Sequence, residues 1–99
     1  MDISVSVGCG EMTATAYDDE GKELHSATNN DFASAYFRAP FGSPQERRAI
    51  VEGEDAALIL LLQWVVSEGL WTREEADSYH RAWRTVSNYD RLLREWPHD

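Results

Sequence analysis

The residues of this chain that could do chemistry are few and lie far apart in the sequence. Cys9 is its single cysteine, and a nucleophilic thiolate needs a base beside it, such as His25 or His80. A metal site needs three or four ligands at workable spacing, whereas His25, His80 and His98 share no helical turn. The sequence therefore predicts neither catalytic residues nor a metal site, and we expect a protein that is not an enzyme and uses no cofactor.

Acidic residues dominate the composition. The chain holds 18 aspartates and glutamates against 9 lysines and arginines, which gives a formal net charge of -9. Nucleic-acid binding needs lysine and arginine to displace the counterions of the phosphates, and a negative field repels anionic membranes as well. We therefore expect no direct binding to nucleic acid or to a membrane.

Carboxylates gather in the stretch YDDEGKE at 17–23. Asp18, Asp19, Glu20 and Glu23 stand there with Lys22 as the one base among them. One interpretation is the solvated tip of a β-hairpin, where charges also discourage pairing between sheet edges. The other is an acidic ridge that docks against positive charge on a partner protein. Because like charges this close repel one another, we favour the second and predict that these four carboxylates bind a partner.

The aromatic stretch DFASAYFRAPFG at 31–42 is a second candidate surface. Phe32, Tyr36, Phe37 and Phe41 fall within this one segment. One interpretation is that the rings cover the open face of a sheet. The other is that Tyr36, Phe37 and Arg38 project as a patch for a partner, since aromatic residues and arginine are enriched in interfaces. Tyr36 and Phe37 are therefore candidate partner-binding residues.

The first thirty residues predict strands. Apolar and polar residues alternate over 3–7 and over 12–17, which is typical of half-buried strands. The segment DDEGK follows as a turn in which Gly21 supplies a positive φ. A third, weaker strand is expected from Lys22 to about Ala27.

The remainder of the chain predicts helices. Ser43, Pro44 and Glu46 match an N-cap, a first-turn proline and a capping box. The stretch AALILLLQWVV at 56–66 is apolar nearly all round, so we expect its helix in the middle of the fold, ending at Gly69. The sequence leaves open whether Gly53 splits residues 44–67 into two helices.

A last helix follows a very short connection. Thr72 and Glu75 form a second capping box, and a connection this short makes the two helices antiparallel neighbours. Trp71, in the connection, either packs in the core or anchors an interface. The apolar stripe of the last helix begins with Ala76, Tyr79, Trp83 and Val86.

These elements predict an α+β fold. We expect a small antiparallel β-meander of two or three N-terminal strands, packed against a C-terminal α-helical hairpin. With 99 residues the chain has room for one domain, with residues 1–30 rich in β-structure and residues 31–99 helical.

The chain has no pattern of export or membrane insertion. Its first ten residues lack the basic start and apolar run of a signal peptide. The longest apolar run, 56–66, is interrupted by Gln63 and is well short of the roughly 20 residues that span a bilayer. A lone cysteine fits a reducing compartment, so we expect a cytoplasmic protein.

In size, acidity, cysteine content, α+β pattern and the acidic stretch YDDEGKE, the chain is similar to the small phage-encoded inhibitors of the anti-CRISPR type. The resemblance implies a non-enzymatic inhibitor that uses an acidic surface, in some cases as a nucleic-acid mimic. Its partner would be a protein with a basic, nucleic-acid-binding site in a bacterial defence complex, such as a CRISPR effector subunit. It would act in the cytoplasm of a host bacterium.

The sequence also permits a different class of function. The chain would then be a small structural or regulatory subunit, antitoxin-like or immunity-like, or one half of a homodimer. Such a protein would bind through its apolar helices and the aromatic stretch, and its binding would depend little on salt.

Overall fold

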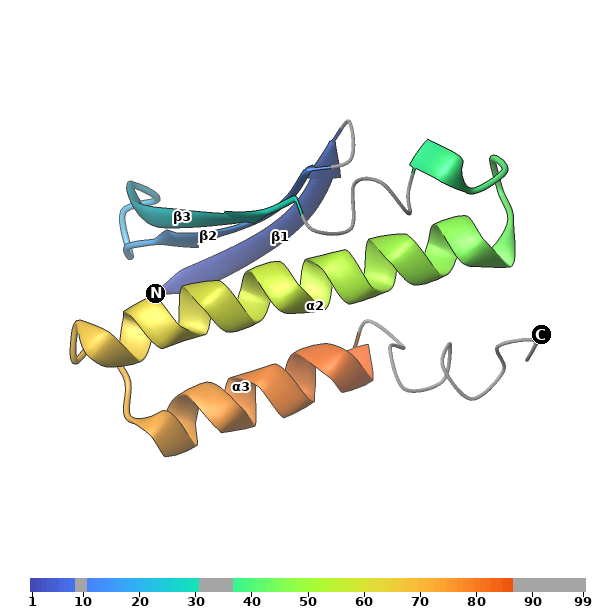
Figure 1. Ribbon diagram of the computed structural model, residues 1–99. Helices are drawn as coiled ribbons and strands as arrows, with labels where there is room; N and C mark the ends of the chain where they lie inside the picture. The colour runs from blue at the N-terminus through green and yellow to red at the C-terminus, as the bar shows by residue number, and fades with distance from the viewer. Residues whose placement is uncertain (9–10, 31–36, 87–99) are drawn as a thin grey trace.

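The fold consists of a three-stranded sheet followed by two helices, in three layers (Figure 1). The computed structural model describes residues 1–8, 11–30 and 37–86. The sheet lies on one side of helix α2 (Pro44–Ser67), and helix α3 (Arg73–Val86) lies on the other. The α+β prediction of an N-terminal meander and a C-terminal helical hairpin is confirmed.

The sheet is an antiparallel meander in the order β1-β2-β3. Its strands are β1 (Asp2–Gly8), β2 (Glu11–Tyr17) and β3 (Glu23–Asn29). The third strand is as long as the other two, and the expected end at Ala27 was too early. Its backbone pairs with β2 as far as the Met12–Asn29 pair, and this pairing depends on a partner strand rather than on the strand's own residues.

The two faces of the sheet differ in chemistry. Met12, Ala14 and Ala16 of β2 are completely buried on the face that meets α2. The opposite face carries short hydroxyl side chains that hydrogen-bond across the strands. The Oγ1 atoms of Thr13 and Thr28 are 3.2 Å apart, and Thr15 Oγ1 lies 3.1 Å from Ser26 Oγ. This alternation follows the period of two along a strand.

Residues 44–67 form one helix, which settles the question that Gly53 raised. Glu46 N donates to the Oγ of the N-cap Ser43 at 3.2 Å, which is one half of the predicted capping box. The Glu46 carboxylate accepts from Gly42 N at 3.3 Å, whereas Ser43 N donates to Pro40 O. Gly53 is buried against the sheet, and a Cβ at this position would stand 2.7 Å from Cγ of Met12. The glycine therefore allows α2 to approach β2 closely, and the long apolar helix continues through it.

The connection between α2 and α3 is short and tightly hydrogen-bonded. Gly69 adopts a φ of +73°, its N–H donates to Val66 O, and Leu70 N–H donates to Val65 O. This pattern is a Schellman motif, which satisfies the last carbonyls of a helix. At the start of α3, Thr72 and Glu75 form the reciprocal capping box that the sequence predicts, with bonds of 3.0 and 3.1 Å.

Helix α2 joins the layers through two apolar clusters. Ala57, Leu61 and Val65 pack against β2, whereas Leu58 and Leu62 pack against Ala76 of α3. The helix is not covered on every side, because Ile59 and Leu60 are about 40% exposed. Trp71 packs against both clusters and is half-buried, so it is a core residue rather than an exposed anchor.

Aromatic and polar contacts also fasten the three layers. The His25 ring of β3 stacks on Trp64 of α2 with centroids 4.4 Å apart and planes within 10°. His80 Nε2 of α3 lies 2.6 Å from Asp55 Oδ1 of α2. Among the described residues, no helix combines the length and the apolar content of a membrane-spanning segment.

Candidate functional site

The turn between β2 and β3 is ordered by one of its own carboxylates. Asp18 Oδ1 accepts hydrogen bonds from Glu20 N and Lys22 N, both at 2.9 Å. Gly21 has a φ of +82°, as predicted for this turn, and its N–H donates to Asp18 O at 3.0 Å. Asp18 therefore holds the backbone of the turn, and the exposed carboxylates of Asp19, Glu20 and Glu23 remain on the outside.

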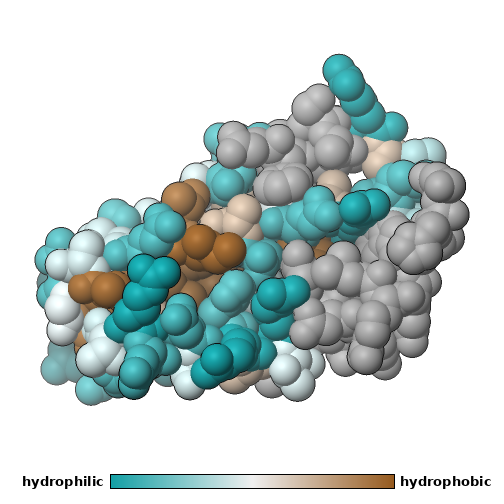
Figure 2. Space-filling view, turned by 60° about the horizontal axis from the view of Figure 1, so that its bottom comes forward, coloured by the Kyte–Doolittle hydropathy of each residue, from teal (hydrophilic) through white to brown (hydrophobic). Residues whose placement is uncertain are grey.

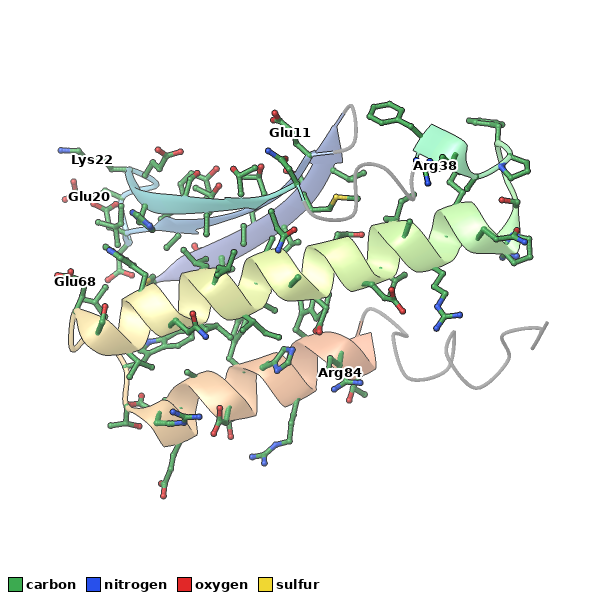
Figure 3. The ribbon with its side chains drawn as sticks, in the orientation of Figure 1. Glu11, Glu20, Lys22, Arg38, Glu68 and Arg84 are labelled. Carbon is green, nitrogen blue, oxygen red and sulfur yellow. The ribbon has the colours of Figure 1, made fainter. Side chains whose placement is uncertain are left out.

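Other parts of the chain bring more carboxylates to the same end of the molecule. Asp2 of β1 is paired with Tyr17, directly before the turn. Glu68, which caps the last turn of α2, lies at the same end as Glu20 and Lys22 (Figure 3). We call this region the acidic end. Its described carboxylates belong to Asp2, Asp18, Asp19, Glu20, Glu23 and Glu68.

Few positive charges oppose these carboxylates. Lys22 stands in the turn itself, and the N-terminal ammonium group of Met1 forms an ion pair of 3.1 Å with Asp19 Oδ1. The Asp19 side chain is 94% exposed, so water screens this pair and it adds little stability. Glu11 lies at the opposite end of the sheet, where it pairs with Gly8 (Figure 3). It does not belong to the acidic end, although it is close to these residues in the sequence.

The acidic end surrounds an open apolar cleft of about 290 Å³. Leu24 comes from β3, and Leu70 and Trp71 come from the connection between α2 and α3. Leu24 is the extra residue of a bulge, because Tyr17 pairs with Glu23 while Ala16 pairs with His25. The remaining lining residues are Met1, Asp18 and Asp19. Leu24 and Leu70 are 42% and 48% exposed, so the cleft presents apolar surface between carboxylates.

The aromatic stretch lies at the other end of the molecule, before α2. Phe37 is 66% exposed and Phe41 is 97% exposed, whereas Tyr36 lies outside the described residues. Arg38 projects from this end (Figure 3), and Arg47 is exposed in the first turn of α2. Phe37 and Arg38 are both exposed, and their role in binding a partner stays a prediction. Phe41 is the most exposed large apolar residue of those described.

A second concave surface lies between the two helices. Seen from the side of α3, the molecule shows hydrophobic surface bordered by hydrophilic side chains (Figure 2). The groove has a volume of about 300 Å³, its floor is formed by Ile59, Leu62 and Val66, and Ser67 and His80 stand at its rim.

The polar residues of the groove do not form a catalytic triad. His80 is hydrogen-bonded to Asp55, whereas Ser67 donates its hydroxyl proton to Trp64 O at 2.8 Å. Asp55 and Ser67 belong to the same helix and lie about 18 Å apart along it at 1.5 Å per residue. A Ser–His–Asp triad needs all three groups within hydrogen-bonding reach of one another.

The remaining candidates for chemistry are also placed apart. His25 and His80 lie on opposite sides of α2, since one belongs to the sheet and the other to α3. Cys9 and His98 lie outside the described residues. Within the described part of the chain, no three His, Cys, Asp or Glu side chains come close enough to hold a metal ion.

Sequence reasoning found some residues of the acidic end and missed others. Asp18, Asp19, Glu20 and Glu23 are brought together as a hairpin turn predicts. Glu68, Leu24 and Leu70 could be assigned to the same surface only from the tertiary structure, because they lie on different elements.

Neither a family model, nor a curated protein, nor a solved structure matches this chain.

Proposed function

We propose that this protein is a non-enzymatic inhibitor that binds a partner protein through its acidic end. The observation that carries the proposal is the gathering of carboxylates from β1, the β2–β3 turn and the end of α2 at the end of the molecule that holds one apolar cleft, with Asp18 and Asp19 lining it. An apolar centre inside a charged rim is a common arrangement in protein interfaces. The apolar centre supplies affinity, and the charged rim supplies steering and selectivity.

The charge of the acidic end indicates the kind of partner. A protein surface that normally binds nucleic acid is rich in lysine and arginine, and a rim of fixed carboxylates can take the place of phosphates on it. We therefore propose a basic, nucleic-acid-binding site of a bacterial defence complex as the target, in line with the resemblance to inhibitors of the anti-CRISPR type. The protein would act in the bacterial cytoplasm, where such complexes operate.

Competition with DNA tests this proposal. The protein is titrated into a panel of purified RNA-guided effector complexes with labelled target DNA, and DNA binding is followed by gel shift at 50 and 300 mM NaCl. We expect at least one complex to lose DNA binding, and inhibition to weaken at the higher salt because screening reduces the attraction.

A pair of charge reversals distinguishes the effect of the acidic end on inhibition from the effect of the net charge of the protein. Glu20→Lys changes an exposed carboxylate of the acidic end, and Glu11→Lys makes the same change at the opposite end of the sheet. We expect Glu20→Lys to raise the inhibitory concentration about tenfold or more and Glu11→Lys to leave it within about twofold. Equal losses for the two variants, or no competition with any complex, would count against the proposal.

A second function is favoured by the exposed aromatic rings at the other end. Phe41 is 97% exposed, which no folding requirement explains. We infer that, if the acidic end is not the interface, the protein is a small regulatory subunit that docks through Phe37 and Phe41. Phe41→Ala would then abolish binding to a partner, and NaCl would have little effect on that binding.

A further inference from the structure

Phe41 stands at the tip of a rigid turn. Ser43 N donates to Pro40 O at 3.0 Å, and Gly42 has a φ of +75°, as in a type II turn with glycine at its third position. Gly42 N also donates to Glu46 Oε1 at 3.3 Å. The backbone that presents the phenyl ring is therefore held by hydrogen bonds, which lowers the entropy that the backbone would lose when the ring binds another surface.

Three arginines flank this turn along the chain. Arg38 lies before the turn, Arg47 and Arg48 lie in the first two turns of α2, and all three are exposed. Arg48 forms an ion pair of 3.0 Å with Glu52, and Glu46 is occupied by the helix cap. We call residues 40–43 with these arginines the aromatic turn. It is a basic region in a chain whose net charge is -9.

The acidic end has the complementary form. Its cleft is apolar at the centre, where Leu24, Leu70 and Trp71 line it, and Asp18 and Asp19 stand at its edge. A cavity of about 150 Å³ lined by apolar side chains is large enough for a benzene molecule, so the cleft of about 290 Å³ has room for one phenyl ring. The exposed phenyl ring flanked by arginines and the apolar cleft edged by carboxylates are therefore complementary in polarity and in charge.

One copy of the chain cannot join these two surfaces to each other. Helix α2 begins beside the aromatic turn and ends beside the cleft (Figure 1). Its 24 residues separate the two surfaces by about 36 Å at 1.5 Å per residue. The cleft of one copy is therefore open to the aromatic turn of a second copy.

We propose that this protein self-associates head to tail, with Phe41 of one copy inserted into the acidic cleft of the next. The two surfaces of such a contact differ, so a pair of copies keeps one free turn and one free cleft, and the assembly can continue as an open chain or close as a ring. The inference does not depend on the proposed function, although self-association would cover the acidic end and compete with a partner there.

Sedimentation velocity of the purified protein tests the proposal without any partner. At 50 mM NaCl the weight-average mass should rise above the monomer value of 11.3 kDa as the concentration increases. The rise should be smaller at 500 mM NaCl because salt screens the contact between arginines and carboxylates. A protein that stays monomeric up to 1 mM at low salt would overturn the proposal.

Two complementary variants identify the contact. Phe41→Asp removes the phenyl ring of the aromatic turn and leaves the cleft intact. Leu70→Asp places a charge in the apolar lining of the cleft and leaves the aromatic turn intact. Each variant alone should be monomeric. An equimolar mixture should form a dimer of twice the monomer mass, because the intact aromatic turn of one variant can bind the intact cleft of the other. A dimer that pairs like surfaces, turn against turn or cleft against cleft, does not give this result, because one of the two variants would still dimerise alone. A mixture that stays monomeric would refute the contact between the turn and the cleft.

Matched variants control for loss of folding and for nonspecific self-association. Leu60→Asp places the same charge at an exposed leucine away from the cleft, on α2, which is 42% exposed against 48% for Leu70. It should leave self-association unchanged. Glu20→Lys gives a second, independent change at the cleft that does not touch its apolar lining, and it should weaken self-association at least threefold. Loss of self-association in Leu60→Asp as well would contradict the assignment. Because no partner is present, these outcomes are separate from those of the DNA competition.

Discussion

At the scale of single residues, neighbouring carboxylates of the same stretch have different roles. Asp18 holds the turn with two backbone hydrogen bonds, and Asp19 pairs with the N-terminal ammonium group. Glu20 and Glu23 are exposed, so substitutions at these two residues are the best test of partner binding. Asp18 is unsuitable for that test, because Asp18→Ala would disturb the turn as well as the charge.

A half-buried carboxylate, that of Glu54, gives a prediction for the dependence of stability on pH. Burial raises the pKa of Glu54 above its ordinary value of 4.5, because the ionised group loses hydration. The folded protein then holds this proton more tightly than the unfolded chain does. The contribution of Glu54 to stability therefore falls as the pH rises from 4.5 through the raised pKa, and it stays lower above that value.

Glu54→Gln should accordingly be more stable than the parent at pH 7. The difference in melting temperature should shrink as the pH falls towards 4, where Glu54 is protonated in both states. Calorimetry of the two proteins between pH 4 and 7 measures this difference, with Glu11→Gln as an exposed control that should show no such trend. A difference that is the same at every pH would contradict the assignment to burial.

At the scale of elements, the close approach of α2 to the sheet depends on one pair of residues. Gly53 has no side chain, and Met12 fills the space that a Cβ would need, with Cγ, Sδ and Cε all within 3.0 Å of that position. In an exposed helix, alanine in place of glycine adds about 1 kcal/mol of stability. At position 53 the same change forces the buried Met12 to move.

We therefore expect Gly53→Ala to lower the free energy of unfolding by about 1 to 2 kcal/mol, as overpacking of a core does. In a Met12→Ala background the clash is removed, and Gly53→Ala should then stabilise the protein by up to about 1 kcal/mol. Urea denaturation of the four proteins gives the coupling energy of this cycle, about 2 kcal/mol or more. Equal effects of Gly53→Ala in both backgrounds would show that the two residues are not in contact.

At the scale of the whole molecule, charge is separated along the length of α2. Carboxylates surround its C-terminal end, and three arginines lie around its N-terminal end. Carboxylates that are crowded at one end repel one another and destabilise the folded state, and salt screens this repulsion.

We expect Glu20→Lys to be at least as stable as the parent, with a melting temperature about 1 to 3 °C higher at 20 mM NaCl. The gain should fade at 500 mM NaCl, and Glu11→Lys should gain less because it lies away from the acidic end. Thermal melts at the two salt concentrations measure this. A large loss of stability in Glu20→Lys would mean that its carboxylate has a structural role, and its loss of binding could not then be assigned to charge.

The local elements of this protein were determined by its sequence alone. The alternating residues of β1 and β2, Gly21 in the turn, and the caps at Ser43 and Thr72 all act within a few residues of one another, and the structure has each of them where the pattern predicts it. The α+β class followed from the order of these elements, because strands joined by short turns must pair and helices joined by a short connection must lie antiparallel.

The candidate surface was decided by the tertiary structure. Glu68 and Leu70 join Glu20 only because α2 runs the length of the sheet and ends beside the β2–β3 turn, and Glu11 is excluded because β2 carries it to the far end. Gly53 lies where α2 packs against the sheet, and Met12, 41 positions earlier, occupies the space that a Cβ would need there. Such contacts depend on distances between elements, which local residue patterns do not contain.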